Sequence, residues 1–414
     1  MDRTKVYVVG VGLEGGQGLS RGAAGLIEGA EVLYGGKRLL SLFPDHPADK
    51  VAIGGDIQTV IQAVHARLGK KRQVVLASGD PFFFGIAESL VGELGKHAVE
   101  VLPNLSSLQL AFARIKESHS DATFVSLHAK GLRELFAAIP HAKKIGILTD
   151  PTNTPQRIAS ELLERIGPRY VAHVFENLGG VNERATFGEL HDIASQTFSP
   201  LNVVVLLKKE PGPQEVFPIT GIPDEAFFQR TPDKGLITKA EVRAVSLAKL
   251  RLKETSVVFD IGAGSGSVGL EAARIARKGM VYAIEKHPED VEHIKKNRLK
   301  LAVANLEIVQ GIAPEALQDI PEAPDAVFVG GSGGRMKGIL EHAARVLQPF
   351  GRVVVNVATL ETLAQTLRAF KGIGFQAEVT LIQASRSKQL LGLTRLVGLN
   401  PVFLVVGWRN AVEP

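Results

Sequence analysis

The glycine-rich run at residues 260–266 has the residue types and spacing to bind a nucleotide-type cofactor. Asp260 opens the run, and glycines follow at three alternate positions that end at Gly266. Glycines lack the Cβ atoms that would block a ligand, so the amides of a following helix can face a carboxylate or a phosphate. Glu285 stands nineteen residues after Gly266, where a carboxylate could accept hydrogen bonds from both hydroxyls of a ribose.

A strand, a turn and a helix must position this run. Residues 257–259 form a short β-branched and aromatic stretch that predicts a strand, and residues 268–273 favour a helix. Residues 281–284 predict a second strand, which Glu285 ends. The carboxyl ends of the two strands would then bring the glycine turn and the acid to one edge of a parallel sheet.

The glycine spacing leaves more than one function open. Gly264, Gly266 and Gly269 also satisfy the G-x-G-x-x-G pattern of dinucleotide-binding dehydrogenases, and a tight turn without a ligand is a third interpretation. The longer run D-x-G-x-G-x-G resembles the first motif of the Rossmann-like methyltransferases that depend on S-adenosylmethionine (SAM). We therefore favour a SAM-dependent methyltransferase.

Length and composition limit the possible classes of protein. With 414 residues, 45% of them hydrophobic and 22% charged, the chain should contain two or three globular cores. The absence of cysteine excludes disulfides, zinc-thiolate sites and cysteine nucleophiles, and we assign no metal site. No apolar run is long enough to span a bilayer and no secretory signal is evident, so we expect a cytoplasmic protein without a membrane partner. The net charge of +5 suits either nucleic acid or a polyanionic small molecule.

The N-terminal half alternates predicted strands and helices, which indicates a mostly parallel sheet. Its motifs are Ser78-Gly79-Asp80-Pro81-Phe82-Phe83-Phe84-Gly85, Pro103-Asn104-Leu105-Ser106-Ser107, Ser126-Leu127-His128-Ala129 and Glu176-Asn177-Leu178-Gly179-Gly180. Their order resembles the tetrapyrrole methylase family over residues 3–208. That family has two small α/β lobes with SAM between them, and the resemblance implies contacts from Ser78, Gly79, Asp80, Phe83, Ser106 and Ser107. Leu13 departs from the proline that many members have in the first glycine loop, so the role of that loop stays open.

Prolines at 211, 213, 218 and 223 mark a boundary between the two halves. We expect a bilobal tetrapyrrole methylase domain at residues 1–210, a linker at 211–233, and a Rossmann-like methyltransferase domain at 234–414. The expected fold class is therefore α/β throughout.

The C-terminal half resembles a second family, the decarboxylating precorrin methyltransferases of cobalamin synthesis, from about residue 222 to 408. The resemblance is carried by Asp224-Glu225-Ala226-Phe227, Thr238-Lys239, Glu241-Val242-Arg243, Ala313-Pro314-Glu315-Ala316-Leu317, Val329-Gly330-Gly331-Ser332-Gly333-Gly334 and Asn400-Pro401-Val402. It implies SAM contacts from Thr238, Gly262, Ala263, Gly264, Ser265, Gly266, Glu285 and Ala313. Ile312 stands where the family usually has an acid.

Together the two resemblances imply a bifunctional enzyme with two SAM sites per chain. It would methylate a precorrin at carbon 5 with the N-terminal half and at carbon 15 with the C-terminal half, with loss of carboxylate from an acetate side chain. We assign no general base, and we expect Lys239, Arg243 and Arg335 to clamp substrate carboxylates. We also expect a homo-oligomer that binds no nucleic acid. An RNA methyltransferase and a SAM-binding regulatory module remain the alternatives.

Overall fold

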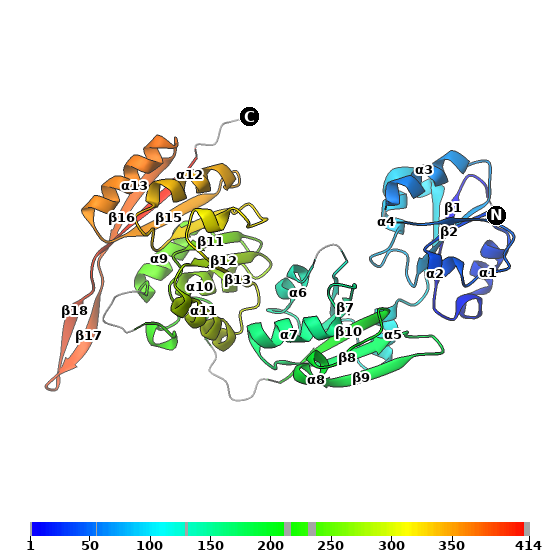
Figure 1. Ribbon diagram of the computed structural model, residues 1–414, viewed down its shortest axis with the longest axis horizontal. Coiled ribbons are helices and arrows are strands. Elements are labelled where there is room, and N and C mark those ends of the chain that lie inside the picture. Colours follow the sequence, from blue (N-terminus) through cyan, green and yellow to red (C-terminus); the bar gives the residue numbers. More distant parts are fainter. Residues whose placement is uncertain (1, 55, 129–130, 211–216, 231–236, 410–414) are drawn as a thin grey trace. The chain divides into compact units, whose positions relative to one another are not determined.

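A computed structural model describes residues 2–54, 56–128, 131–210, 217–230 and 237–409, and the chain in it divides into two units (Figure 1). The first unit comprises residues up to 131 together with 142–159 and 170–208. The second comprises residues 132–141 and 160–169 and the described residues from 209 onward. In the described part of the chain, no helix is long and apolar enough to cross a membrane.

The first lobe of the N-terminal unit is a five-stranded, wholly parallel sheet in the order β3-β2-β4-β1-β5. The strands are β1 (Val6–Val11), β2 (Val32–Gly35), β3 (Asp49–Ala52), β4 (Gln73–Ser78) and β5 (Val99–Leu102). The helices are η1 (Gly15–Gly18), α1 (Arg21–Glu28), α2 (Lys37–Leu40), α3 (Ile57–Arg67), α4 (Ala87–Leu94) and η2 (Lys96–Ala98). Val6 and Val8 pack with α3 and α4, whereas Tyr7 and Val9 pack with α1 and α2. Both faces of β1 are therefore buried, as in other parallel sheets.

The second lobe is a mixed sheet in the order β6-β7-β10-β8-β9. The strands are β6 (Thr123–Ser126), β7 (Lys144–Leu148), β8 (Tyr170–Glu176), β9 (Arg184–Glu189) and β10 (Asn202–Lys208). The helices that occur along this stretch are α6 (Arg133–Ala138), α7 (Pro155–Ile166) and α8 (Leu190–Ala194). Only β6 and β7 pair in parallel. Helix α5 (Ser107–Arg114) connects the lobes and buries Leu108 and Phe112 against Val203 and Val205 of β10.

The second unit is built on a seven-stranded sheet in the order β13-β12-β11-β14-β15-β19-β16. The strands are β11 (Val257–Ile261), β12 (Met280–Glu285), β13 (Leu306–Gln310), β14 (Ala326–Val329), β15 (Arg352–Val357), β16 (Gln376–Ile382) and β19 (Val402–Trp408). The strands from β13 to β15 are parallel, and β19 is antiparallel to both of its neighbours. The hairpin of β17 (Ser385–Leu390) and β18 (Leu393–Gly398) extends away from this sheet (Figure 1).

Helices cover this sheet and bury its core. They are α9 (Ala240–Leu250), α10 (Ser267–Ile275), α11 (Pro288–Leu301), α12 (Met336–Val346) and α13 (Leu360–Gly372), with the short turns η3 (Asp224–Ala226) and η5 (Glu315–Leu317). Side chains from α9, α10 and α11 pack in one cluster with Val258, Val281 and Phe328 of the sheet. The α/β fold class predicted from the sequence is confirmed, and the strand–turn–helix unit lies where it was predicted, at β11 and α10.

The linker prediction is wrong in part. Ile222 and Phe227 are buried in the core of the second unit, and Phe217 packs against that core. The prolines at 218 and 223 therefore shape a segment that folds with the C-terminal sheet, because its apolar side chains gain more from burial than from exposure to water. Residues 211–216 and 231–233 of the predicted linker lie outside the described residues.

Candidate cofactor sites

In the first unit, the loop after β4 meets the start of α5. Gly79 has a φ of +60°, and a Cβ there would lie 2.8 Å from Cα of Ser106, so only glycine fits this turn. Ser106 is the N-cap of α5, where its hydroxyl accepts a hydrogen bond from the amide of Gln109 at 3.1 Å. The structure thus brings the two predicted groups, Ser78–Asp80 and Ser106–Ser107, to the carboxyl edge of the parallel sheet.

Two polar side chains of this loop already take part in hydrogen bonds within the protein. The Ser78 hydroxyl accepts a hydrogen bond from the guanidinium of Arg38 at 2.9 Å. One carboxylate oxygen of Asp80 accepts from the amide of Phe82 at 2.9 Å, which fixes the turn. The other oxygen of Asp80 would be the one to pair with a cationic group such as an ammonium. Arg38 was missed from the sequence, because it lies forty residues before its partner.

Phe83 has a packing role in the structure. Its ring lies 5.0 Å from the ring of Phe124, edge to face, and it packs against the cluster that holds Leu108 and Phe112. Phe82 and Phe84, by contrast, are about half exposed. Phe83 therefore joins the loop after β4 to the second lobe, and its contact with a cofactor stays a prediction.

In the second unit, the predicted glycine loop follows β11 and leads into α10. Gly262 has a φ of +69°, and a Cβ there would lie 2.4 Å from the carbonyl oxygen of Gly331 in the loop after β14. The two glycine loops therefore touch backbone to backbone at the carboxyl edge of the sheet. Gly266 is the N-cap of α10, and nearby Ser265 is 4% exposed with a hydroxyl that has no hydrogen-bond partner in the described structure. A buried hydroxyl without a partner in this loop fits a site that is completed by a ligand.

Glu285 lies where the sequence predicted an acid, at the last residue of β12. One of its carboxylate oxygens accepts from the amide of Gly264 at 2.9 Å. The other accepts from the amides of Lys286 and His287 at 2.8 and 2.9 Å. The acid is thus held rigidly beside the glycine loop, and the lone pair that remains on the oxygen bonded to Gly264 can accept a hydrogen bond from a ribose.

Asp260 is a second acid at this edge, and it is buried. One of its carboxylate oxygens accepts from the amide of Gly269 at 2.8 Å, and the other has no hydrogen-bond partner in the described structure. Burial, against the lowering effect of the hydrogen bond from Gly269 and with a smaller contribution from the negative charge of Glu285, raises the pKa of Asp260 to about 7. Asp260 therefore orients the first turn of α10 from behind the loop.

Asn297 is a residue of this site that sequence reasoning missed. It is fully buried on α11, and its amide nitrogen donates to the carbonyls of Ser265 and Phe228, both at 2.9 Å. Its amide oxygen accepts from the amide of Phe228 at 2.7 Å. Asn297 thus ties the glycine loop to the segment at 217–230. A lone asparagine within a helix gave no signal of this role.

Ala313 and Thr238 are the other two predicted cofactor contacts of this unit, and their surroundings differ. Ala313 is buried after β13, in a loop held by the amide of Gly311, which donates to the carbonyl of Glu285 at 3.0 Å. Its neighbour Ile312 is 47% exposed, so the position where the family has an acid carries an apolar side chain at the surface. Thr238 is half-buried before α9. Their contacts with a cofactor stay predictions.

Arg243 corrects the expectation of a substrate clamp. Its side chain is 0% exposed, and its guanidinium donates to Glu271 at 2.7 Å and to Asp224 at 3.2 Å. It also donates to the carbonyls of Thr238, at 2.7 Å, and Ile222. Arg243 has no exposed surface to offer a substrate, because α9 buries the face on which it lies. The helix begins at Ala240, with Lys239 as its N-cap.

Arg386, at the start of the hairpin, extends this buried group of charges. It donates to Asp224 at 2.9 Å and to both oxygens of Glu241, at 2.8 and 2.7 Å. The hydrogen bonds from Arg386 lower the pKa of Glu241 to about 2. Glu271 in turn accepts from the amides of Gly221 and Ile222, each at 3.0 Å. Arg243, Asp224 and Glu271 are buried, Arg386 and Glu241 are partly exposed, and the five form one network of charges.

The other two predicted clamps lie at the surface. Lys239 is half-buried at the start of α9. Arg335 follows the second glycine loop and donates to both carboxylate oxygens of Glu315, at 2.7 and 2.8 Å. Both side chains of that pair are about half exposed, so a substrate carboxylate could replace Glu315 at little cost. Both clamps stay proposals.

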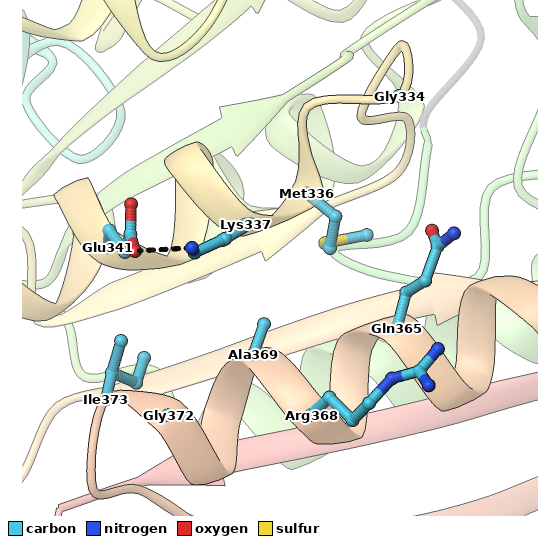
Figure 2. A pocket seen from close by; sticks show the side chains of 9 residues that line it. All are labelled: Gly334, Met336, Lys337, Glu341, Gln365, Arg368, Ala369, Gly372 and Ile373. Atoms are coloured by element: carbon cyan, nitrogen blue, oxygen red, sulfur yellow. Dashed lines mark ion pairs between the residues drawn. The ribbon is translucent and has the colours of Figure 1, made fainter.

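A groove of about 580 Å³ lies between α12 and α13 (Figure 2). It is lined by Gly334, Met336, Lys337, Glu341, Gln365, Arg368, Ala369, Gly372 and Ile373. Among the residues of the second glycine loop, only Gly334 lines it, and none of the predicted cofactor contacts does. The groove is therefore distinct from the predicted cofactor site around Gly262 and Glu285.

Comparison with known families assigns both halves of the chain. The tetrapyrrole (corrin/porphyrin) methylase family matches residues 5–194, and the precorrin methyltransferase domain family matches residues 228–411. The fold and these matches define the class of protein as a SAM-dependent methyltransferase with two different α/β modules.

Individual relatives narrow the class. A precorrin-6Y C(5,15)-methyltransferase (decarboxylating) from Sinorhizobium sp. is 32% identical over 407 residues, which are 97% of this chain and 95% of the relative. The chain belongs to the family of decarboxylating precorrin-6Y C5,15-methyltransferases. A probable cobalt-precorrin-6B C(15)-methyltransferase (decarboxylating) from Pyrobaculum calidifontis is 40% identical over 190 residues, 45% of this chain and 95% of the relative. The solved structure of a precorrin-6Y C5,15-methyltransferase from Geobacter metallireducens is 37% identical, with a TM-score of 0.45, and covers 47% of this chain and 98% of its own.

Proposed function

We propose that the chain methylates a precorrin at carbon 5 with its N-terminal module and at carbon 15 with its C-terminal module, where an acetate side chain also loses its carboxylate. The observation that carries this division is that a relative named for the C(15) reaction alone spans only 45% of the chain, about the length of the precorrin methyltransferase module. The family match favours a tetrapyrrole over RNA as the methyl acceptor.

We further propose one SAM site in each unit. In the first, Ser78–Asp80, Phe83 and Ser106–Ser107 would hold it; in the second, Thr238, Gly262–Gly266, Glu285 and Ala313. The support is that each unit carries its own loop and helix start on its own sheet. SAM supplies an electrophilic methyl group that an electron-rich carbon of the reduced ring can accept.

The protein's own residues then have to orient the substrate and exclude water. An in-line displacement depends mainly on the alignment of the methyl donor with the acceptor carbon, at a separation of about 3–3.5 Å. Gly262 and Gly331, whose backbones are in contact, carry no side chains at this point of the carboxyl edge of the sheet. That open surface suits a broad planar ring. Lys239, which precedes α9, and Arg335, which follows the second glycine loop, are the proposed partners of substrate carboxylates.

Calorimetry with SAM on the full chain tests the number of sites, and mass spectrometry of product from the reduced precorrin tests the reaction. We expect two SAM molecules per chain, with Asp80→Ala removing one and Gly264→Val the other. Gly264 has a φ of +55°, so valine would strain the loop and crowd the ligand. A stoichiometry of one in cofactor-free protein would refute the two-site proposal. A product that gains methyl groups without losing CO₂ would refute the decarboxylation.

A further inference from the structure

Lys286 lies at the carboxyl edge of the second unit's sheet, one residue after Glu285. Its ammonium nitrogen is 3.7 Å from the position that a Cβ at Gly333 would occupy. Gly333 belongs to the loop after β14, and β11 lies between β12 and β14 in the sheet. The side chain of Lys286 therefore reaches across the end of β11, beside the glycine loop that starts at Gly262.

The ammonium of Lys286 is available for a ligand. The side chain is exposed, and it has no ion pair or side-chain hydrogen bond within the described residues. The backbone amide of Lys286 is held on Glu285 at 2.8 Å, so the base of the side chain is fixed although its end is free. Of the other cations predicted as substrate clamps, Arg335 pairs with Glu315, and Arg243 pairs with Asp224 and Glu271.

The loop beside Lys286 leaves space for a large ring. A Cβ at Gly331 or at Gly334 would meet no atom within 4 Å, and Gly333 and Gly334 both have positive φ. A flat substrate could thus lie over this loop with its edge at the lysine. The chemical class that suits such a place is a planar polycarboxylate, since an ammonium binds a carboxylate as a strong, charge-assisted hydrogen-bond donor.

We propose that Lys286 binds a substrate carboxylate that the reaction retains. In the decarboxylation, the bond between the acetate methylene and its carboxylate breaks, its electron pair passes into the conjugated ring, CO₂ leaves, and the carbon takes up a proton from solvent. A cation on the departing carboxylate would stabilise the ground state and lose its partner in the transition state, which slows the reaction. Lys286 therefore holds a spectator carboxylate and sets the position of the ring. This inference rests on the proposed precorrin substrate.

Lys286→Met and Lys286→Arg test the proposal in the full chain, with Lys278→Met as the matched control. Lys278 precedes β12 at the opposite edge of the sheet, is 54% exposed and pairs with Glu254. For each variant and for the wild type, we would measure the KM for the reduced precorrin, the amount of CO₂ released per methyl group transferred, and the Kd of SAM by calorimetry. We expect Lys286→Met to raise KM for the precorrin in the CO₂-releasing reaction about ten-fold or more, as for the loss of a charged hydrogen bond. Lys286→Arg should stay within about three-fold of wild type, since it keeps the charge.

Three results would overturn the proposal. An unchanged KM in Lys286→Met means that no substrate carboxylate binds there. A rise in the SAM Kd equal to the rise in KM makes Lys286 a cofactor residue. A change in CO₂ released per methyl group places the lysine on the departing carboxylate. If wild-type protein neither methylates the precorrin nor releases CO₂, the failure belongs to the proposed function itself.

Discussion

Replacing Arg243 with methionine separates a structural role from substrate binding. Methionine keeps much of the length of the side chain and removes its charge and all of its donors. The guanidinium makes four hydrogen bonds in a site with no exposed surface, to Glu271, Asp224, Thr238 and Ile222. The substitution therefore leaves two buried carboxylates without their shared cation.

The loss of stability depends on the hydrogen bonds that Asp224 and Glu271 keep without Arg243. Removing one partner of a buried ion pair costs about 3–5 kcal/mol. Asp224 keeps its bond from Arg386, and Glu271 keeps two backbone amides, so both acids stay partly satisfied. We therefore expect the free energy of unfolding of the C-terminal unit to fall by about 3 kcal/mol, at the lower end of that range.

The assay uses the chain's single tryptophan, Trp408, which lies on β19 and packs against the core of the second unit. Urea unfolding followed by its fluorescence reports that unit in the full chain. Arg335→Ala is the control, because its exposed pair with Glu315 should contribute less than about 1 kcal/mol. If Arg243→Met lowers the free energy of unfolding by less than about 1 kcal/mol and raises only the KM for the tetrapyrrole, the structural role of Arg243 is wrong and the residue binds substrate as first predicted.

Three further predictions follow from the same unit. Asp260→Asn should flatten the pH dependence of the free energy of unfolding, because it removes the titrating carboxyl group. In the wild type, the raised pKa of Asp260 stabilises the native state below about pH 4 by at most about 4 kcal/mol, and this contribution is lost as the pH rises to about 7. A wild-type and variant difference that does not vary across this range in urea titrations would contradict it. A fragment of residues 217–414 should unfold cooperatively, whereas 234–414, without Ile222, should be less stable by at least about 2 kcal/mol in urea; equal midpoints would place residues 217–233 outside the core. Lys239→Met should raise the KM for precorrin about ten-fold with little change in SAM affinity, and near-wild-type kinetics would end its role as a clamp.

The backbone pattern of the C-terminal site could be predicted from the sequence, because it is set by local signals. Glycines at alternate positions require a turn with positive φ, and Glu285 ends a short apolar strand. Both features depend on residues within thirty positions of each other. The same holds for Ser106, whose N-cap role follows from the start of a helix.

Roles that depend on distant partners could not be predicted in this way. In the sequence, Arg243 stands near Lys239 and was therefore expected at the surface. Leu247 and Leu250 follow it at helical spacing, and this pattern was the signal that Arg243 lies on the buried face of α9. Its carboxylate partners are nineteen residues before it and twenty-eight after it. Prolines likewise concealed that the segment at 217–230 packs into a core, because they report turns and carry no information on burial.

The three amides that hold Glu285 also bear on which nucleotides the second unit can accept. The carboxylate is fastened to Gly264 on one oxygen and to Lys286 and His287 on the other, so it cannot swing aside. A ribose with free hydroxyls donates to such an acid, whereas a ribose phosphorylated at either hydroxyl would press one anion against another that cannot retreat. In the proposed cofactor site, charge repulsion would therefore disfavour phosphorylated cofactors of the NADP type and favour unphosphorylated adenosines.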